Sequence, residues 1–94
     1  MKRPARSFFK FAPDLAIEVL SPNNTRSEIQ ERLRDFFSSG TKLVWIIDPE
    51  SKSAEVCNSL EKRRLVGPNG ELSGEDVVPG FCYKLADLFQ EWSW

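Results

Sequence analysis

The amino-acid sequence predicts a mixed α/β fold in which a strand, one main helix and a second strand are followed by a β-hairpin and a short C-terminal helix. Two short apolar runs, residues 15–20 and 43–47, have the length and the β-branched content of buried strands. Between them lies a segment with apolar residues at helical spacing. A strand, a helix and a strand in this order form a βαβ unit, so we expect a mixed sheet containing two parallel strands.

Length and composition restrict the possible functions. The chain has 94 residues, 40% hydrophobic and 29% charged, which allows one small domain with a core over about residues 13–90. It has no histidine, and Cys57 and Cys82 lack metal-binding spacing, so zinc sites and histidine-dependent catalysis are excluded from within this sequence. Both cysteines are expected to be reduced and half-buried. Without an apolar segment of membrane-spanning length or a signal peptide, we expect a cytoplasmic protein with no membrane partner.

The first strand contains a charge among apolar residues. Strand alternation gives it two faces, with Leu15, Ile17 and Val19 on one and Ala16, Glu18 and Leu20 on the other. We expect both faces to be covered, which would bury the carboxylate of Glu18. A buried, unpaired carboxylate is strongly unfavourable, so a metal ion, a basic side chain such as Arg26 or Arg32, or partial exposure should compensate it.

The main helix has clear boundaries in the sequence. Thr25 and Glu28 have the spacing of a capping box, and Gly40 is suited to the end of the helix. The apolar stripe consists of Ile29, Leu33, Phe36 and Phe37. Arg32 lies at the edge of this stripe. It either pairs with Glu28 one turn earlier or directs its cation back to the end of the first strand, near Glu18.

The second half of the chain is more polar. Residues 42–48 form the second buried strand, which Pro49 ends. Residues 54–57 and 62–66 are expected to form a hairpin at the sheet edge that faces solvent on one side. A turn at residues 67–70 precedes a loop or short strand at residues 76–81, and the last helix begins near Leu85 and ends near Trp92.

Two further charged features of the sequence can each be explained by a function or by structure alone. Net charge is −1, but basic residues gather at the start of the chain, at Lys2, Arg3, Arg6 and Lys10. This segment is either a contact for a polyanion such as DNA or a solvated terminus. Asp14 is typical of a turn or cap residue. It shares a strand face with Glu18, but roughly 13 Å separates the two at about 3.3 Å per residue, so one ion cannot bind both.

The order and spacing of the motifs resemble those of a known family. The residues that carry the resemblance are 12–25 (APDLAIEVLSPNNT), 31–33, 43–49 and 72–81. The sequence resembles the Uma-two family of restriction endonucleases over nearly the whole chain after about Ser7. This resemblance implies a truncated restriction-endonuclease-like core of the PD-(D/E)XK type, with Mg²⁺ as cofactor and DNA as substrate.

The resemblance also implies roles for individual residues. In that fold, a first carboxylate comes from a strand that would precede this chain, and the second comes from the strand that here holds Glu18. Glu18 is then a catalytic residue and a metal ligand, and the backbone carbonyl of Val19 is a further ligand. Arg32 occupies the helix position of the family's lysine. Arginine keeps the charge but hardly deprotonates, so it is a poor general base.

The sequence therefore predicts a single, N-terminally truncated nuclease-like domain over residues 1–94. Its first metal-binding aspartate is missing, so we expect a Mg²⁺-dependent DNA endonuclease whose activity is impaired or lost. The alternative is a catalytically silent dimeric interaction module or a gene fragment. A sheet edge left open by missing strands invites pairing with a second chain. The expected partner is a second copy or a separately encoded N-terminal half.

Overall fold

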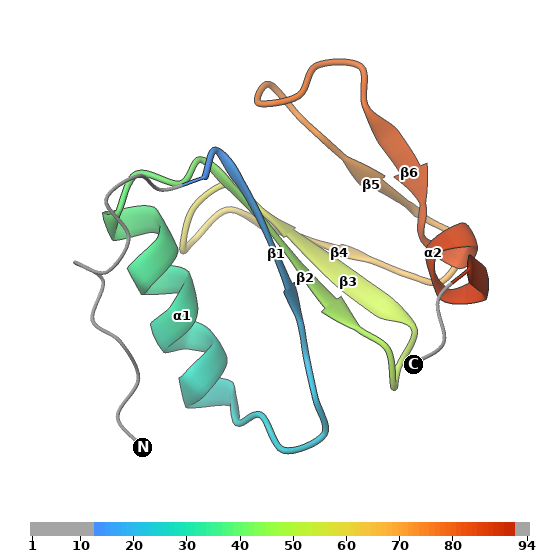
Figure 1. The fold of residues 1–94 in the computed structure, drawn as a ribbon, viewed down its shortest axis with the longest axis horizontal. Helices are drawn as coiled ribbons and strands as arrows, with labels where there is room; N and C mark the ends of the chain where they lie inside the picture. Colours follow the sequence, from blue (N-terminus) through green and yellow to red (C-terminus); the bar gives the residue numbers. More distant parts are fainter. Residues whose placement is uncertain (1–12, 92–94) are drawn as a thin grey trace.

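The computed structural model describes residues 13–91, and its elements follow one another along the chain in Figure 1. They are β1 (Leu15–Val19), α1 (Arg26–Ser38), β2 (Leu43–Asp48), β3 (Ser53–Cys57), β4 (Arg63–Val66), β5 (Glu71–Ser73), β6 (Cys82–Lys84) and α2 (Leu85–Glu91). The basic segment at residues 1–12 and the predicted helix end at Trp92 lie outside the described residues. None of the described helices is long and apolar enough to cross a membrane.

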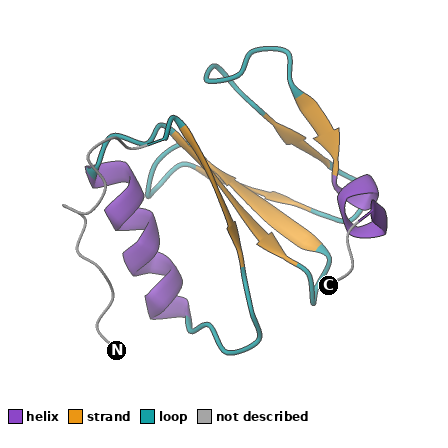
Figure 2. Ribbon diagram, in the orientation of Figure 1, coloured by secondary structure: helices purple, strands orange, loops and turns teal. Residues whose placement is uncertain are grey.

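The main sheet has the strand order β1-β2-β3-β4. Strand β1 runs parallel to β2, and the two remaining pairs are antiparallel. Figure 2 shows α1 on one side of this sheet and a smaller sheet with α2 on the other. The predicted mixed α/β fold is confirmed, with its parallel strand pair, main helix, hairpin and short last helix.

Helix α1 begins and is oriented as its sequence predicts. The Thr25 hydroxyl accepts a hydrogen bond from the Glu28 backbone N–H at 3.1 Å, and the Glu28 carboxylate accepts one from the Thr25 N–H at 2.8 Å. Gly40, at a φ of 107°, follows the helix in a conformation that favours glycine. The predicted stripe packs on the sheet, where Leu33 joins a buried cluster with Ala16, Val44, Ile46 and Cys57.

The opposite face of the main sheet is covered by β5, β6 and α2. Strands β5 and β6 pair in an antiparallel way, and Leu72 and Leu85 from this layer are fully buried against β2 and β3. The sequence suggested a loop or short strand at residues 76–81 and no separate sheet. It also placed β3 at an edge, which is wrong. Strand β3 pairs on both sides, and Ala54 and Val56 are buried because the small sheet covers them.

The two cysteines differ in exposure, which corrects the expectation that both are half-buried. Cys57 is fully buried and Cys82 is exposed, and both are free thiols. Burial raises the pKa of the Cys57 thiol from 9.0 to about 11.

We expect only one thiol, that of Cys82, to react with a thiol reagent in the native protein at pH 8, because the thiolate is the reactive form and Cys57 is both inaccessible and protonated. Both thiols should react in denaturant.

The native protein keeps the Cys57 thiol protonated at a pH where the unfolded chain ionises it. Its contribution to stability is thus complete below about pH 9 and is lost as the pH rises towards 11. Counting reacted thiols by mass spectrometry checks the first result, and urea titrations between pH 8 and 10 check the second.

Candidate active site

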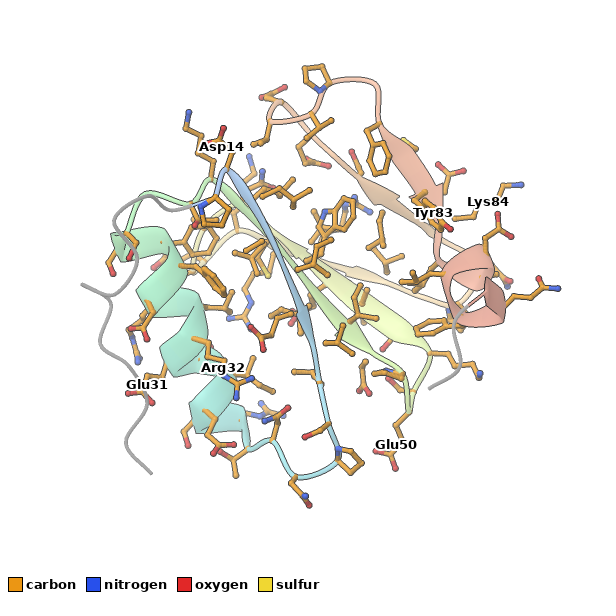
Figure 3. The ribbon with its side chains drawn as sticks, in the orientation of Figure 1. Asp14, Glu31, Arg32, Glu50, Tyr83 and Lys84 are labelled. Carbon is orange, nitrogen blue, oxygen red and sulfur yellow. The ribbon has the colours of Figure 1, made fainter. Side chains whose placement is uncertain are left out.

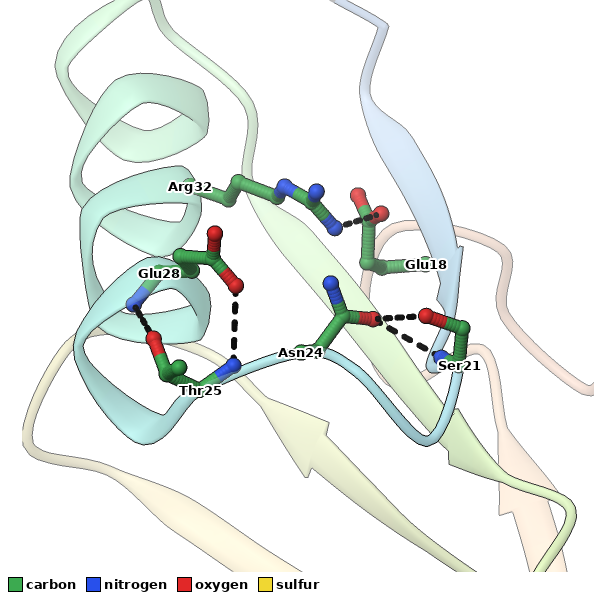
Figure 4. Close-up of polar contacts among 6 residues, drawn as sticks. All are labelled: Glu18, Ser21, Asn24, Thr25, Glu28 and Arg32. Atoms are coloured by element: carbon green, nitrogen blue, oxygen red, sulfur yellow. Dashed lines mark hydrogen bonds and ion pairs between the residues drawn. The ribbon is translucent and has the colours of Figure 1, made fainter.

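Glu18 on β1 and Arg32 on α1 form an ion pair. The Arg32 Nη1 donates to the Glu18 Oε2 at 2.7 Å (Figure 4). Their side chains are 23% and 33% exposed, respectively, so the pair is shielded without being cut off from solvent. Of the basic partners considered from the sequence, Arg32 is therefore the one that compensates Glu18.

The local sequence explains why the two side chains meet. Glu18 lies opposite Ile46 of β2, on the sheet face that α1 covers. Ser21 closes the turn after β1 through its backbone N–H, which donates to the Asn24 Oδ1 at 2.8 Å, and the capping box then starts α1 (Figure 4). Leu33 anchors the helix on the sheet, so its neighbour Arg32 extends along the sheet towards Glu18.

The alternative partner of Arg32, Glu28, has another role. The hydrogen bond from the Thr25 backbone is the main reason that the pKa of Glu28 lies below its ordinary value, and the nearby charge of Arg32 is the smallest of the causes. Glu28 is thus chiefly a capping residue. Among the described residues, the carboxylate that Arg32 contacts at hydrogen-bond distance is that of Glu18.

The expectation that both faces of β1 are covered is wrong. Ile17 and Val19 are 56% and 42% exposed, whereas Ala16 on the other face is buried. Within residues 13–91, β1 pairs only with β2 and forms an edge of the sheet. The small sheet packs on β2 and β3 and does not extend over these two side chains. Partial exposure and the cation of Arg32 together lower the cost of placing Glu18 in an apolar strand.

Two oxygen atoms near this edge are suitable metal ligands. The Glu18 Oε1 receives no hydrogen bond from any described residue. The Leu20 N–H donates to the Ile47 carbonyl, and the Asp14 carbonyl accepts from the Leu43 N–H, so even-numbered residues of β1 bond to β2. Since alternate residues direct their backbone groups to opposite edges, the Val19 carbonyl points to the outer edge.

The residues present fit part of a metal shell. Mg²⁺ typically keeps several waters and binds one or two carboxylates together with substrate phosphate. The described residues contain no group of three or more side chains that could hold a metal ion. Asp14 is exposed and lies at the far end of β1 (Figure 3), so the prediction that it cannot join Glu18 holds. One carboxylate oxygen and one carbonyl remain.

A pocket that the sequence did not predict lies beside this site. It has a volume of about 550 Å³ and is bordered by the ends of β1 and β2 and the start of α1. Arg63 lines the pocket, and its Nη1 donates to the Gln30 Oε1 at 3.1 Å. Its Nη2 donates to the Glu55 Oε1 at 3.4 Å. The predicted pair of parallel strands could have indicated this pocket, because α/β proteins commonly bind ligands at the carboxyl ends of their strands.

Comparisons with known proteins identify the family and the fold. Residues 2–87 match the model of the Uma2 family, described as "Putative restriction endonuclease". The chain belongs to the Uma2 family. The chain also matches the crystal structure of a "putative nuclease belonging to DUF820" from Anabaena variabilis, with a TM-score of 0.73 and 24% sequence identity. The match covers 87% of this chain and 46% of that one, so the Uma2 chain spans less than half of the solved protein. Among curated proteins, no match was found.

The family model shows the family, and the match to the solved structure, at 24% identity, shows the fold. The resemblance inferred from residues 12–25, 31–33, 43–49 and 72–81 is therefore confirmed at the level of the family and the fold.

Proposed function

We propose that this chain carries part of the active site of a Mg²⁺-dependent DNA endonuclease and that its activity alone is impaired. The observation that supports the proposal is the pairing of Glu18 with Arg32 at 2.7 Å on a partly exposed sheet edge. The pair brings a carboxylate oxygen and a guanidinium together, and the backbone carbonyl of the next residue, Val19, belongs to the same strand. These are the groups that a metal ion and a phosphodiester require.

Glu18 and Val19 are the proposed metal ligands, through Oε1 and the backbone carbonyl. A bound Mg²⁺ supplies a water of lowered pKa and stabilises the negative charge that develops on the phosphate. Glu18 remains oriented by Arg32 through its other oxygen, Oε2. Arg32 has five N–H donors, so one bond to Glu18 leaves others for a phosphate oxygen.

The same residues explain the proposed impairment. The described residues contain no group of three or more side chains that could hold a metal ion, so an ion at Glu18 is held by few protein oxygens. Arginine is a poor general base, so Arg32 is poorly suited to removing a proton from the attacking water. We therefore expect the chain to bind DNA but to cleave it slowly.

A plasmid-nicking assay with the full chain in Mg²⁺ or Mn²⁺ tests the proposal. We expect slow, metal-dependent nicking by the wild type and a loss of at least about 10–100-fold in Glu18→Ala, because removal of a ligand costs no less than removal of a group that supports one. Glu61→Ala is the matched control, since Glu61 is an exposed acid in the turn between β3 and β4. Equal nicking by Glu18→Ala and Glu61→Ala, or nicking that persists in EDTA, would contradict the proposed function.

The exposure of Ile17 and Val19 favours a second candidate, a catalytically silent interaction module. In that case, the chain contributes a sheet edge to another polypeptide, either a second copy or a separately encoded N-terminal half. Silent protein would bind no Mn²⁺ in a titration calorimeter and would nick no plasmid, yet would still associate. Sequencing the DNA directly upstream tests for a separately encoded half, because such a half would appear there as a second reading frame that codes for further strands.

A further inference from the structure

The outer edge of β1 is available for pairing within the described part of the chain. Even-numbered residues of β1 bond to β2, so Leu15, Ile17 and Val19 direct their backbone N–H and C=O groups outward. An unpaired edge of this kind is a template for a strand of another chain.

The side chains on this edge are apolar and accessible. Ile17 lies opposite Trp45 of β2, and the ring of Phe81 stacks on Trp45 with centroids 5.8 Å apart. Ile17, Val19 and Phe81 are 56%, 42% and 40% exposed. The β1 edge thus combines open backbone groups with uncovered apolar surface, a combination that favours association.

The opposite edge of the main sheet has a different character. Strand β4 also has an exposed apolar residue, Leu65, which is 74% exposed. However, Arg63 and Arg64 precede it, and charged side chains on an edge strand oppose pairing with another chain. Of the two edges, β1 is the one suited to an interface, and β4 provides a control within the same sheet.

We propose that a second copy of this chain pairs antiparallel with β1 across a twofold axis and that it contributes its own Glu18 to the metal site. The metal part of this inference rests on the proposed function, whereas the interface does not. A twofold interface must be self-complementary. The β1 edge satisfies this condition, because the same exposed residues would cover one another in the two copies.

The backbone restricts the pairing to two central registers. Residues that point outward must face outward-pointing residues, so Ile17 lies opposite either the partner's Ile17 or the partner's Val19. In both registers, the four exposed side chains at positions 17 and 19 gather on one face of the joined sheet. The two Glu18 side chains lie together on the other face, the one that α1 covers, because opposed residues of antiparallel strands share a face.

These registers bring the two carboxylates within reach of one ion. When Ile17 faces the partner's Val19, the two Glu18 residues are directly opposite, with Cα atoms about 4.5 Å apart. When Ile17 faces the partner's Ile17, they are diagonal neighbours at roughly 7–8 Å, which long side chains span. The dimer would therefore place a second carboxylate beside Glu18, whereas the described residues of one copy contain no group of three or more side chains that could hold a metal ion. In the direct register, the repulsion between like charges also makes the pairing sensitive to a bound cation.

The interface is tested by sedimentation equilibrium of the full 94-residue chain in EDTA. We expect the wild type to dimerise with increasing concentration. Ile17→Lys and Val19→Lys should be monomeric at the same concentrations, because each places a charge on the joined apolar face. Leu65→Lys should dimerise like the wild type. Both β1 variants change exposed side chains, and circular dichroism shows which of them keep the fold.

A second arm of the experiment adds Mg²⁺ or Mn²⁺ and repeats it with Glu18→Gln. We expect the ion to tighten the wild-type dimer by about 10-fold and to leave the Glu18→Gln dimer unchanged. A dimer that does not respond to the ion would overturn the shared carboxylate site. If the wild type forms a metal-responsive dimer but does not nick plasmid, only the proposed function is contradicted. The two failures are therefore distinguishable.

Three other outcomes would overturn the interface itself. One is a monomeric wild type at the highest soluble concentration. Another is a dimer that Leu65→Lys disrupts as strongly as Val19→Lys does. The third is a monomer in which the outward amides of Ile17 and Val19 are protected from hydrogen exchange, because that result would place another part of the same chain on the edge.

Discussion

Replacing Trp45 with alanine is expected to lower the free energy of unfolding by about 3–5 kcal/mol, the range typical of a buried aromatic residue cut to alanine. Trp45 is only 4% exposed and lies near the middle of β2. Native domains have about 5–15 kcal/mol of stability in total, and small ones lie at the lower end. A loss of this size should therefore leave most of this variant unfolded at 37 °C.

Trp45 joins the two sheets of the molecule. Its indole N–H donates to the Ser73 carbonyl of β5 at 3.0 Å, and its ring stacks on Phe81, which precedes β6. Alanine removes the hydrogen bond, the stack and the ring volume together. The Ser73 carbonyl would lose its partner, and a cavity would open between the layers.

Urea denaturation of two further variants separates these contributions. Trp45→Phe keeps an aromatic ring and loses the N–H donor, so we expect a smaller loss of about 1–3 kcal/mol. Leu65→Ala changes a side chain that is 74% exposed and should stay within about 0.5 kcal/mol of the wild type. If Trp45→Ala were no less stable than Trp45→Phe, Trp45 would not be the joint between the sheets.

The length of each element explains whether the sequence could predict it. Helix α1 and strand β2 have thirteen and six residues with clear periodicity or an apolar run, so their own sequences specify them. Strands β5 and β6 have three residues each, too few to show a period. They are strands because Leu72 of β5 and Tyr83 of β6 pack against the main sheet, and that packing is tertiary.

The candidate site was predictable in its members but not in its surroundings. Glu18 was identified as a charge in an apolar strand, and Arg32 by its place on the helix stripe, and their contact follows from the βαβ order. An apolar run alone does not show how many neighbours a strand has. The exposure of Ile17 and Val19 and the central place of β3 therefore became clear only from the strand order.

The identity of the cation beside Glu18 is expected to have a large effect on the rate of nicking. Under the proposed function, Arg32→Lys should increase the rate of metal-dependent nicking by about 100-fold, within the range that a general base contributes. Lysine restores the residue that the family resemblance places at this position. It keeps the positive charge beside Glu18, but its ammonium group can lose a proton, with an ordinary pKa near 10.4, whereas the guanidinium group stays protonated.

The pH dependence identifies the cause of such an increase. If the lysine acts as the base, nicking by Arg32→Lys rises with pH as more of the amine becomes neutral, whereas nicking by the wild type contains no such limb. A uniform increase at every pH would instead mean that lysine only holds the phosphate better. Arg32→Met is the matched control, because it keeps an extended side chain over the apolar floor beside Ile29 and Leu33 and removes the charge. It should be slower than the wild type and, with Glu18 left unpaired in a partly shielded place, less stable by about 1 kcal/mol or less. Equal rates for Arg32→Lys and Arg32→Met would show that the cation has no part in the reaction and that the ion pair only holds α1 against β1.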